Sequence, residues 1–127
     1  MNPHPIQTTV ERLAKERGRF APRAYFFTLE ALNFTLEAAR KSGHSGHITG
    51  QQLLEGIQKL AVKNFGFLGR TVFQSWGIQS SGDFGKIVFD LVSVQLLSKQ
   101  ETDSEKDFET AQDFSAVFEG SFIHEDA

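Results

Sequence analysis

Residues 66–97 read GFLGRTVFQSWGIQSSGDFGKIVFDLVSVQLL, and this stretch decides the fold. It holds the only tryptophan, Trp76, and four of the thirteen phenylalanines. Phenylalanine has no polar group, so most of these rings are expected in the core, where each contributes a few kcal/mol through burial. The stretch therefore predicts two helices joined by a tight turn at the packing centre of the fold.

The tight turn separates a short helix from a longer one. Apolar residues that recur every four positions (Leu68, Val72 and Trp76) predict the first helix, over about residues 67–76. Gly77 is expected as its left-handed C-terminal cap. Ser80 is expected to cap the second helix, with Asp83 near the positive end of the helix dipole. The buried face of this second helix is expected to comprise Phe84, Ile87, Val88, Leu91 and Val92.

Three further helices are expected upstream, over about residues 6–17, 22–42 and 50–65. The middle one is apolar on more than one side, as a central helix would be. Its polar groups, Tyr25 and Asn33, are each expected to form an internal hydrogen bond. The third helix follows Thr49-Gly-Gln-Gln52, which has the pattern of a capping box.

The composition becomes acidic after Leu97, with phenylalanines spaced along it. One interpretation is a β-hairpin in which residues 94–99 pair with residues 108–114. The alternative is an extended strap followed by a short helix over about residues 113–119. In both, the phenylalanines are anchors on the helical body, and the last residues are expected to be frayed. The predicted anchor residues are Trp76, Phe108, Phe114 and Phe118.

The predicted fold class is mainly α: a compact bundle of about five helices with an optional C-terminal hairpin, similar to a winged helix. At 127 residues the chain fits a single globular domain over residues 1–127, with a core over about 6–118 and an acidic tail over 119–127. In the winged-helix interpretation, residues 67–76 form the supporting helix and residues 82–97 the recognition helix.

The charges of that recognition helix argue against DNA reading. Its exposed face is expected to carry Asp83, Lys86, Asp90 and Ser93. Two carboxylates would then face a duplex with one negative charge per roughly 1.7 Å of its axis. Recognition helices instead present Arg, Lys, Asn or Gln to base edges. A winged-helix shape would therefore serve protein binding or a structural role.

Several functional classes have little support in the composition. Cysteine is absent, which removes disulfides and thiolate sites and is typical of a reducing compartment. His44 and His47 lie in a Gly/Ser loop without the further ligands that a metal site needs. No apolar run is long enough for a membrane span, and no signal peptide is expected. We expect a cytoplasmic, non-enzymatic protein with no cofactor, metal or membrane partner.

The charge is distributed unevenly along the chain. Residues 1–70 carry ten Lys/Arg and five Asp/Glu, whereas residues 71–127 carry three and eleven, and the two halves sum to the net charge of −3. Such asymmetry can indicate a charged partner, or attraction between the two halves. The predicted contacts to phosphate or to a partner are Arg12, Lys15, Arg17, Arg19 and Arg23. Nucleic-acid binding through this basic half is the alternative to a protein-interaction or regulatory module.

The chain resembles a small bacterial family of unknown function, the Minf-type family. The resemblance rests on HITGQQLLEGIQKLAVKNFG (47–66), SWGI (75–78), DFGKIVFDLV (83–92) and the spaced Asp-Phe pairs. It covers roughly residues 22–118 and implies no reaction, cofactor or catalytic residue. Val94-Gln95 departs from the small residue and glycine that the family tends to have after the last helix, and this makes the sharpness of that helix end an open point.

Overall fold

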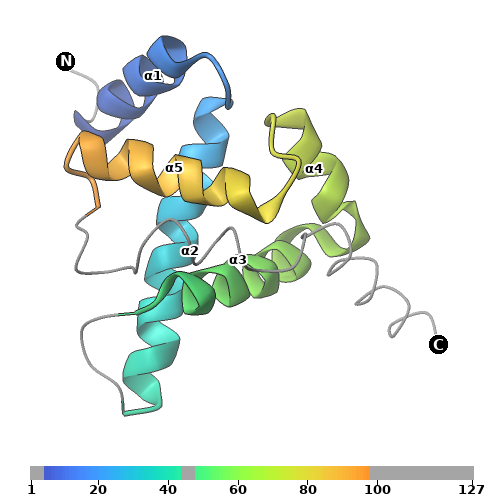
Figure 1. Cartoon of the computed structure of the whole chain (residues 1–127). Helices are drawn as coiled ribbons and strands as arrows, with labels where there is room; N and C mark the ends of the chain where they lie inside the picture. The colour runs from blue at the N-terminus through green and yellow to red at the C-terminus, as the bar shows by residue number, and fades with distance from the viewer. Residues whose placement is uncertain (1–4, 44–47, 98–127) are drawn as a thin grey trace.

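The computed structural model describes residues 5–43 and 48–97, which form helices joined by short turns (Figure 1). The elements are α1 (Pro5–Arg17), α2 (Pro22–Lys41), α3 (Gly50–Phe65), the 3-10 helix η1 (Gly66–Leu68), α4 (Gly69–Ser75) and α5 (Ser81–Ser93). No strand occurs within these described ranges, so the mainly α prediction is confirmed. Of the suggested hairpin, residues 94–97 form turns, and the rest lies outside the described residues.

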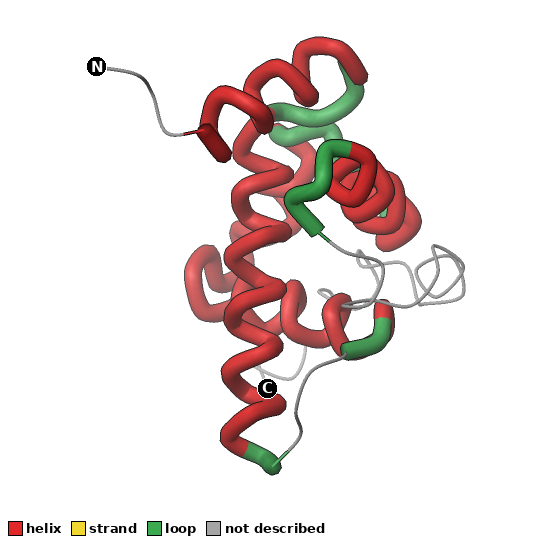
Figure 2. Tube along the Cα trace, turned by 90° about the vertical axis from the view of Figure 1, so that its left-hand side faces the viewer, coloured by secondary structure: helices red, strands yellow, loops and turns green. Residues whose placement is uncertain are grey.

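Helix α2 is the central element, with α1, α3 and α5 all packed against it (Figures 1 and 2). It buries residues on more than one side, as its sequence predicts, because neighbours cover it from several directions. Its buried residues are Ala24, Tyr25, Phe27, Thr28, Ala31, Leu32 and Thr35. Asn33 differs from the expectation: it lies exposed, where water can satisfy its amide without an internal partner.

Both helix N-termini predicted from sequence are formed. The backbone N–H of Gln52 donates to Thr49 Oγ1 at 3.1 Å, and the backbone N–H of Thr49 donates to Gln52 Oε1 at 2.7 Å. These two bonds complete the capping box of α3. At α5, the carboxylate of Asp83 accepts from the backbone N–H groups of Gln79 (2.8 Å) and Ser80 (3.2 Å). The start of each helix is therefore fixed by its local sequence.

An aromatic cluster joins α2, α3, α4 and α5. Phe27 of α2 lies with its ring centroid 5.5 Å from Phe73 and 5.6 Å from Trp76. Phe65 packs on Trp76 at 5.9 Å, and Phe84 on Phe73 at 5.2 Å. Residues 66–97 thus do contribute to the packing centre, with Trp76 buried rather than presented to solvent.

Helices α2 and α3 approach closely at one glycine. A Cβ atom added at Gly56 would lie 1.8 Å from Thr35 Oγ1, far inside van der Waals contact. That hydroxyl is itself committed, because it donates to the carbonyl oxygen of Ala31 at 2.7 Å. The absence of a side chain at position 56 therefore lets α3 pack against α2 at this point.

The turn at Gly77 connects the aromatic cluster to the segment between α1 and α2. Gly77 has φ +89°, and a Cβ atom there would lie 2.5 Å from the backbone oxygen of Arg19. Next to it, the N–H of Ala21 donates to the carbonyl oxygen of Trp76 at 3.0 Å. Both the left-handed conformation and the close backbone approach require glycine, which agrees with the predicted cap.

Helix α5 ends sharply despite lacking a glycine. Gln95 adopts φ +65°, its N–H donates to Val92 O at 3.0 Å, and the N–H of Leu96 donates to Leu91 O at 3.0 Å. These two bonds form a Schellman motif, which turns the chain so that Leu97 is buried. The departure of Val94-Gln95 from a small residue and glycine therefore does not prevent a defined helix end.

Replacing Gln95 with glycine is expected to raise the free energy of unfolding by about 1 kcal/mol, because a left-handed residue with a Cβ atom is strained by roughly that amount. Urea denaturation followed by circular dichroism measures the change. Gln79→Gly, at an exposed position outside the helices and without positive φ, is the matched control and should not stabilise. Equal effects at both positions would contradict the role given to Gln95.

Candidate interaction surfaces

A buried carboxylate ties α5 to α1 and α2. Asp90 is completely buried, so the expectation that it lies on an exposed face of α5 is wrong. The helical spacing of Asp83, Lys86 and Asp90 is correct, but Arg17 at the end of α1 and Arg19 in the following turn lie against Asp90, whereas Ser93 stays exposed. Helical periodicity shows which residues share a face and cannot show where another element covers it.

Three side chains converge on Asp90. The hydroxyl of Tyr25 donates to Oδ2 at 2.8 Å. Arg17 Nε lies 3.2 Å from Oδ1, and Arg19 Nη2 lies 3.6 Å from Oδ2. Oδ1 has no hydrogen bond of good geometry, so its contact with Arg17 is an ion pair. We call Arg17, Arg19, Tyr25 and Asp90 the Asp90 cluster.

Ser93 extends this cluster along α5. Arg17 Nη2 donates to Ser93 Oγ at 3.2 Å, and the Ser93 hydroxyl donates to the backbone oxygen of Asp90 at 2.6 Å. The two arginine side chains remain 40% and 45% exposed, so each pairs with Asp90 from the solvent side. The arrangement stabilises the junction of α1, α2 and α5.

The environment of Tyr25 changes its acidity. Burial raises the pKa of the Tyr25 phenol well above its ordinary value, and the hydrogen bond to the Asp90 carboxylate raises this pKa further. The phenol therefore stays protonated in the folded protein at pH values where an unfolded tyrosine ionises. Deprotonation would leave two negative charges facing each other inside the protein.

This raised pKa predicts a loss of stability in alkali. Above pH 10, the ordinary tyrosine value, the unfolded chain binds fewer protons than the folded chain, so stability falls as pH rises. The Tyr25 contribution has a limiting slope of about 1.4 kcal/mol per pH unit. Urea titrations between pH 9 and 11 should show that the free energy of unfolding falls more steeply with pH in the wild type than in Tyr25→Phe. Parallel declines would contradict the prediction, since lysine titration is common to both proteins.

The predicted basic contact residues separate into two groups. Arg17 and Arg19 belong to the Asp90 cluster, and their charges are partly compensated there. Arg12, Lys15 and Arg23 are exposed on α1 and in the first turn of α2. Of the predicted anchor residues, Trp76 is buried in the aromatic cluster, and Phe108, Phe114 and Phe118 lie outside the described residues, as do His44 and His47.

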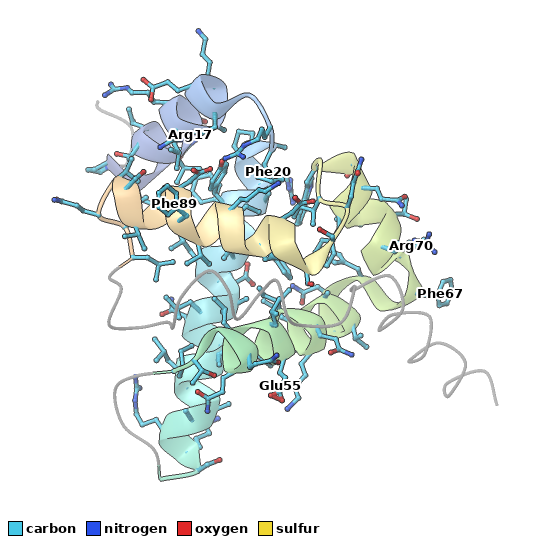
Figure 3. The ribbon with its side chains drawn as sticks, viewed as in Figure 1. Arg17, Phe20, Glu55, Phe67, Arg70 and Phe89 are labelled. Atoms are coloured by element: carbon cyan, nitrogen blue, oxygen red, sulfur yellow. The ribbon has the colours of Figure 1, made fainter. Side chains whose placement is uncertain are left out.

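The corner between α3 and α4 is exposed and apolar. Phe67 is 72% exposed and Leu68 is 57% exposed, and Arg70 points outward beside Phe67 in Figure 3. We call Phe67, Leu68 and Arg70 the Phe67 corner. The sequence predicts one helix over about residues 67–76, in which Leu68, Val72 and Trp76 recur every four positions. The start of that helix differs in the structure: η1 is a 3-10 helix that ends at Leu68, and α4 begins only at Gly69, so Leu68 leaves the α-helical register.

The remaining features offer little for catalysis. A shallow groove between α2 and α3 is open to solvent, and Phe34, Thr35, Gly56 and Lys59 are among the residues that line it. Within residues 5–43 and 48–97, no three His, Asp or Glu side chains gather as metal ligands. No helix in the same ranges combines the length and apolar character needed to cross a bilayer.

Comparisons of this chain with protein-family models, with curated proteins and with solved structures gave no match. The resemblance to the Minf-type family therefore stays a prediction.

Proposed function

We propose that the protein is a non-enzymatic protein-interaction or regulatory module, and that the Phe67 corner binds an apolar segment of a partner protein. The observation that carries this proposal is the exposure of two adjacent large apolar side chains, 72% for Phe67 and 57% for Leu68. Adjacent apolar residues that protrude from a folded surface are typical of the centre of a protein interface.

The support beneath the corner strengthens the proposal. Phe65, directly before η1, and Phe73, in the α4 helix that follows it, both belong to the aromatic cluster, with ring centroids 5.9 and 5.8 Å from Trp76. The corner is thus held between two packed elements. A side chain presented from a packed scaffold loses less conformational entropy on binding than one on a free loop.

The exposed side chains of the corner set the chemistry of the partner. Phe67 and Leu68 offer adjacent apolar surface, and aromatic side chains are enriched at protein interfaces. A segment with apolar side chains for Phe67 and Leu68 would complement the corner. We place this interaction in the cytoplasm, because a chain without cysteine suits a reducing compartment.

Nucleic-acid binding through the basic half is less favoured. Arg17 and Arg19 are paired with Asp90, and on α5 Lys86 Nζ lies 3.6 Å from Asp83 Oδ1. These pairs reduce the positive charge that could face phosphates. Arg12, Lys15 and Arg23 alone would give a weak, salt-dependent contact.

The proposal can be tested by photo-crosslinking from position 67 in cells. A photoreactive phenylalanine analogue replaces Phe67 in the full chain, and crosslinked proteins are identified by mass spectrometry. The purified partner is then titrated with wild type and with Phe67→Ser/Leu68→Ser. We expect at least tenfold weaker binding by the variant, since interface residues of this kind contribute more than about 1.4 kcal/mol.

Ile6→Ser is the matched control, because Ile6 is an exposed apolar residue on α1. It should bind the partner like the wild type. Equal binding by all three proteins, or no protein crosslinked from position 67, would overturn the proposal. Duplex DNA or RNA bound with steep salt dependence and lost in Arg12→Ala/Lys15→Ala/Arg23→Ala would favour the nucleic-acid alternative.

A further inference from the structure

The outer side of α5 carries an apolar strip that leads to the end of the described chain. Phe89 is 56% exposed and lies on the outer side of α5 (Figure 3). Val92 and Leu96 follow at i+3 and i+7 and are partly buried. The i+3 spacing places Val92 one turn beyond Phe89 on the same side of α5, and Leu96 lies in the turn that follows the left-handed Gln95. We call Phe89, Val92 and Leu96 the α5 strip.

Positive charge borders this strip. Lys86 precedes Phe89 by one helical turn, and Arg17 reaches Ser93, one turn beyond Phe89. The arginine side chain remains 40% exposed while it holds Asp90 and Ser93. Asp90 partly compensates the charge of Arg17, and Asp83 that of Lys86, whose side chain remains 49% exposed.

The chain beyond Leu97 has complementary chemistry. Residues 1–97 carry eleven Lys/Arg and seven Asp/Glu, a net charge of +4, whereas residues 98–127 carry two Lys and nine Asp/Glu, a net charge of −7. The same segment contains Asp107-Phe108 and Asp113-Phe114. Each pair offers a ring for an apolar strip next to a carboxylate for a basic border.

The position where this segment begins makes contact within one chain feasible. Leu97 is only 4% exposed, so the last described residue is held at a fixed point after α5. Phe108 follows Leu97 by eleven positions, which can span up to about 36 Å when extended. Helix α5, with 13 residues, is about 20 Å long. Either Asp-Phe pair can therefore reach Phe89.

We propose that residues 98–127 dock on the α5 strip of their own chain, with Phe108 or Phe114 against Phe89 and the preceding aspartates facing Lys86 and Arg17. A tether of this length gives an effective concentration in the millimolar range, which favours the chain's own segment over a second copy. This docking site is separate from the Phe67 corner and does not depend on the proposed function.

The test uses the full chain with a photoreactive phenylalanine analogue at position 89. Chains of natural and heavy isotope composition are mixed, irradiated and analysed by mass spectrometry. We expect crosslinks from position 89 to residues 98–127. In each of them, the two crosslinked peptides should have the same isotope composition, because they come from one chain. Mixed-isotope crosslinks would instead assign the face to a second copy and overturn the proposal.

Charge variants test the chemistry without disturbing the described core. Asp107→Asn/Asp113→Asn should lower the yield of crosslinks from position 89 at least threefold. Glu125→Gln/Asp126→Asn removes the same charge near the end of the chain and should leave the yield unchanged. An unchanged yield in the first variant, an equal drop in both, or no crosslinks from position 89 in the parent chain would overturn the proposal.

Discussion

Replacing Asp90 with alanine is expected to lower the free energy of unfolding by about 3 kcal/mol, the low end of the range for breaking a buried ion pair. The low end applies because Arg17 and Arg19 are 40% and 45% exposed and can be hydrated when their partner is lost. The Tyr25 hydroxyl, by contrast, is buried and would lose its acceptor. Urea denaturation at pH 7 measures the loss.

Two further variants separate the contributions within the Asp90 cluster. Asp90→Asn keeps an oxygen that can accept a hydrogen bond from Tyr25 and removes only the charge. It should therefore lower the free energy of unfolding less than Asp90→Ala does. Tyr25→Phe/Asp90→Ala removes both buried polar groups and should cost less than the sum of the single variants, because no hydroxyl is left without a partner. Additive losses would contradict the coupling between Tyr25 and Asp90.

Replacing Gly56 with valine is expected to lower the free energy of unfolding by about 3 kcal/mol, the upper part of the usual range for overpacking. Even the first atom of the new side chain would lie 1.8 Å from Thr35 Oγ1, so α3 must move away from α2. The valine methyl groups enlarge this displacement. The midpoint of thermal unfolding and urea denaturation both measure the effect.

Gly82→Ala is the matched control for the substitutions at Gly56. A Cβ atom at Gly82 would lie 3.6 Å from Ser80 Oγ, which is ordinary contact, so this change should be neutral or slightly stabilising. Thr35→Ala should reduce the cost of Gly56→Ala, because it removes the hydroxyl that the new Cβ would meet. A Gly56→Val protein as stable as the wild type would refute the close crossing of α2 and α3.

The parts of the fold that local sequence controls were predictable. The capping box at Thr49 and Gln52, the position of Asp83 at the start of α5 and the left-handed Gly77 depend on residues within four positions of one another. Their chemistry requires no knowledge of distant segments. The same holds for the apolar character of α2 on more than one side.

The parts that depend on tertiary contacts were not predictable. Asp90 looked exposed because nothing in its own helix shows that α1 covers it. Leu68 was expected in one helix with Val72 and Trp76 because a four-residue repeat does not reveal a 3-10 turn. The Phe67 corner had one sequence signal, glycines at positions 66 and 69 around two apolar residues, which interrupt a helical pattern.

Two junctions around α2 each contain a unique chromophore. Trp76, the only tryptophan, lies among Phe27, Phe65 and Phe73, whereas Tyr25, the only tyrosine, lies in the Asp90 cluster. Tryptophan emission therefore reports on the junction of α2, α3 and α4. The red-shifted absorbance of the ionised phenol, which appears in alkali, reports on the opening of the junction of α1, α2 and α5, so the two junctions can be followed without any label.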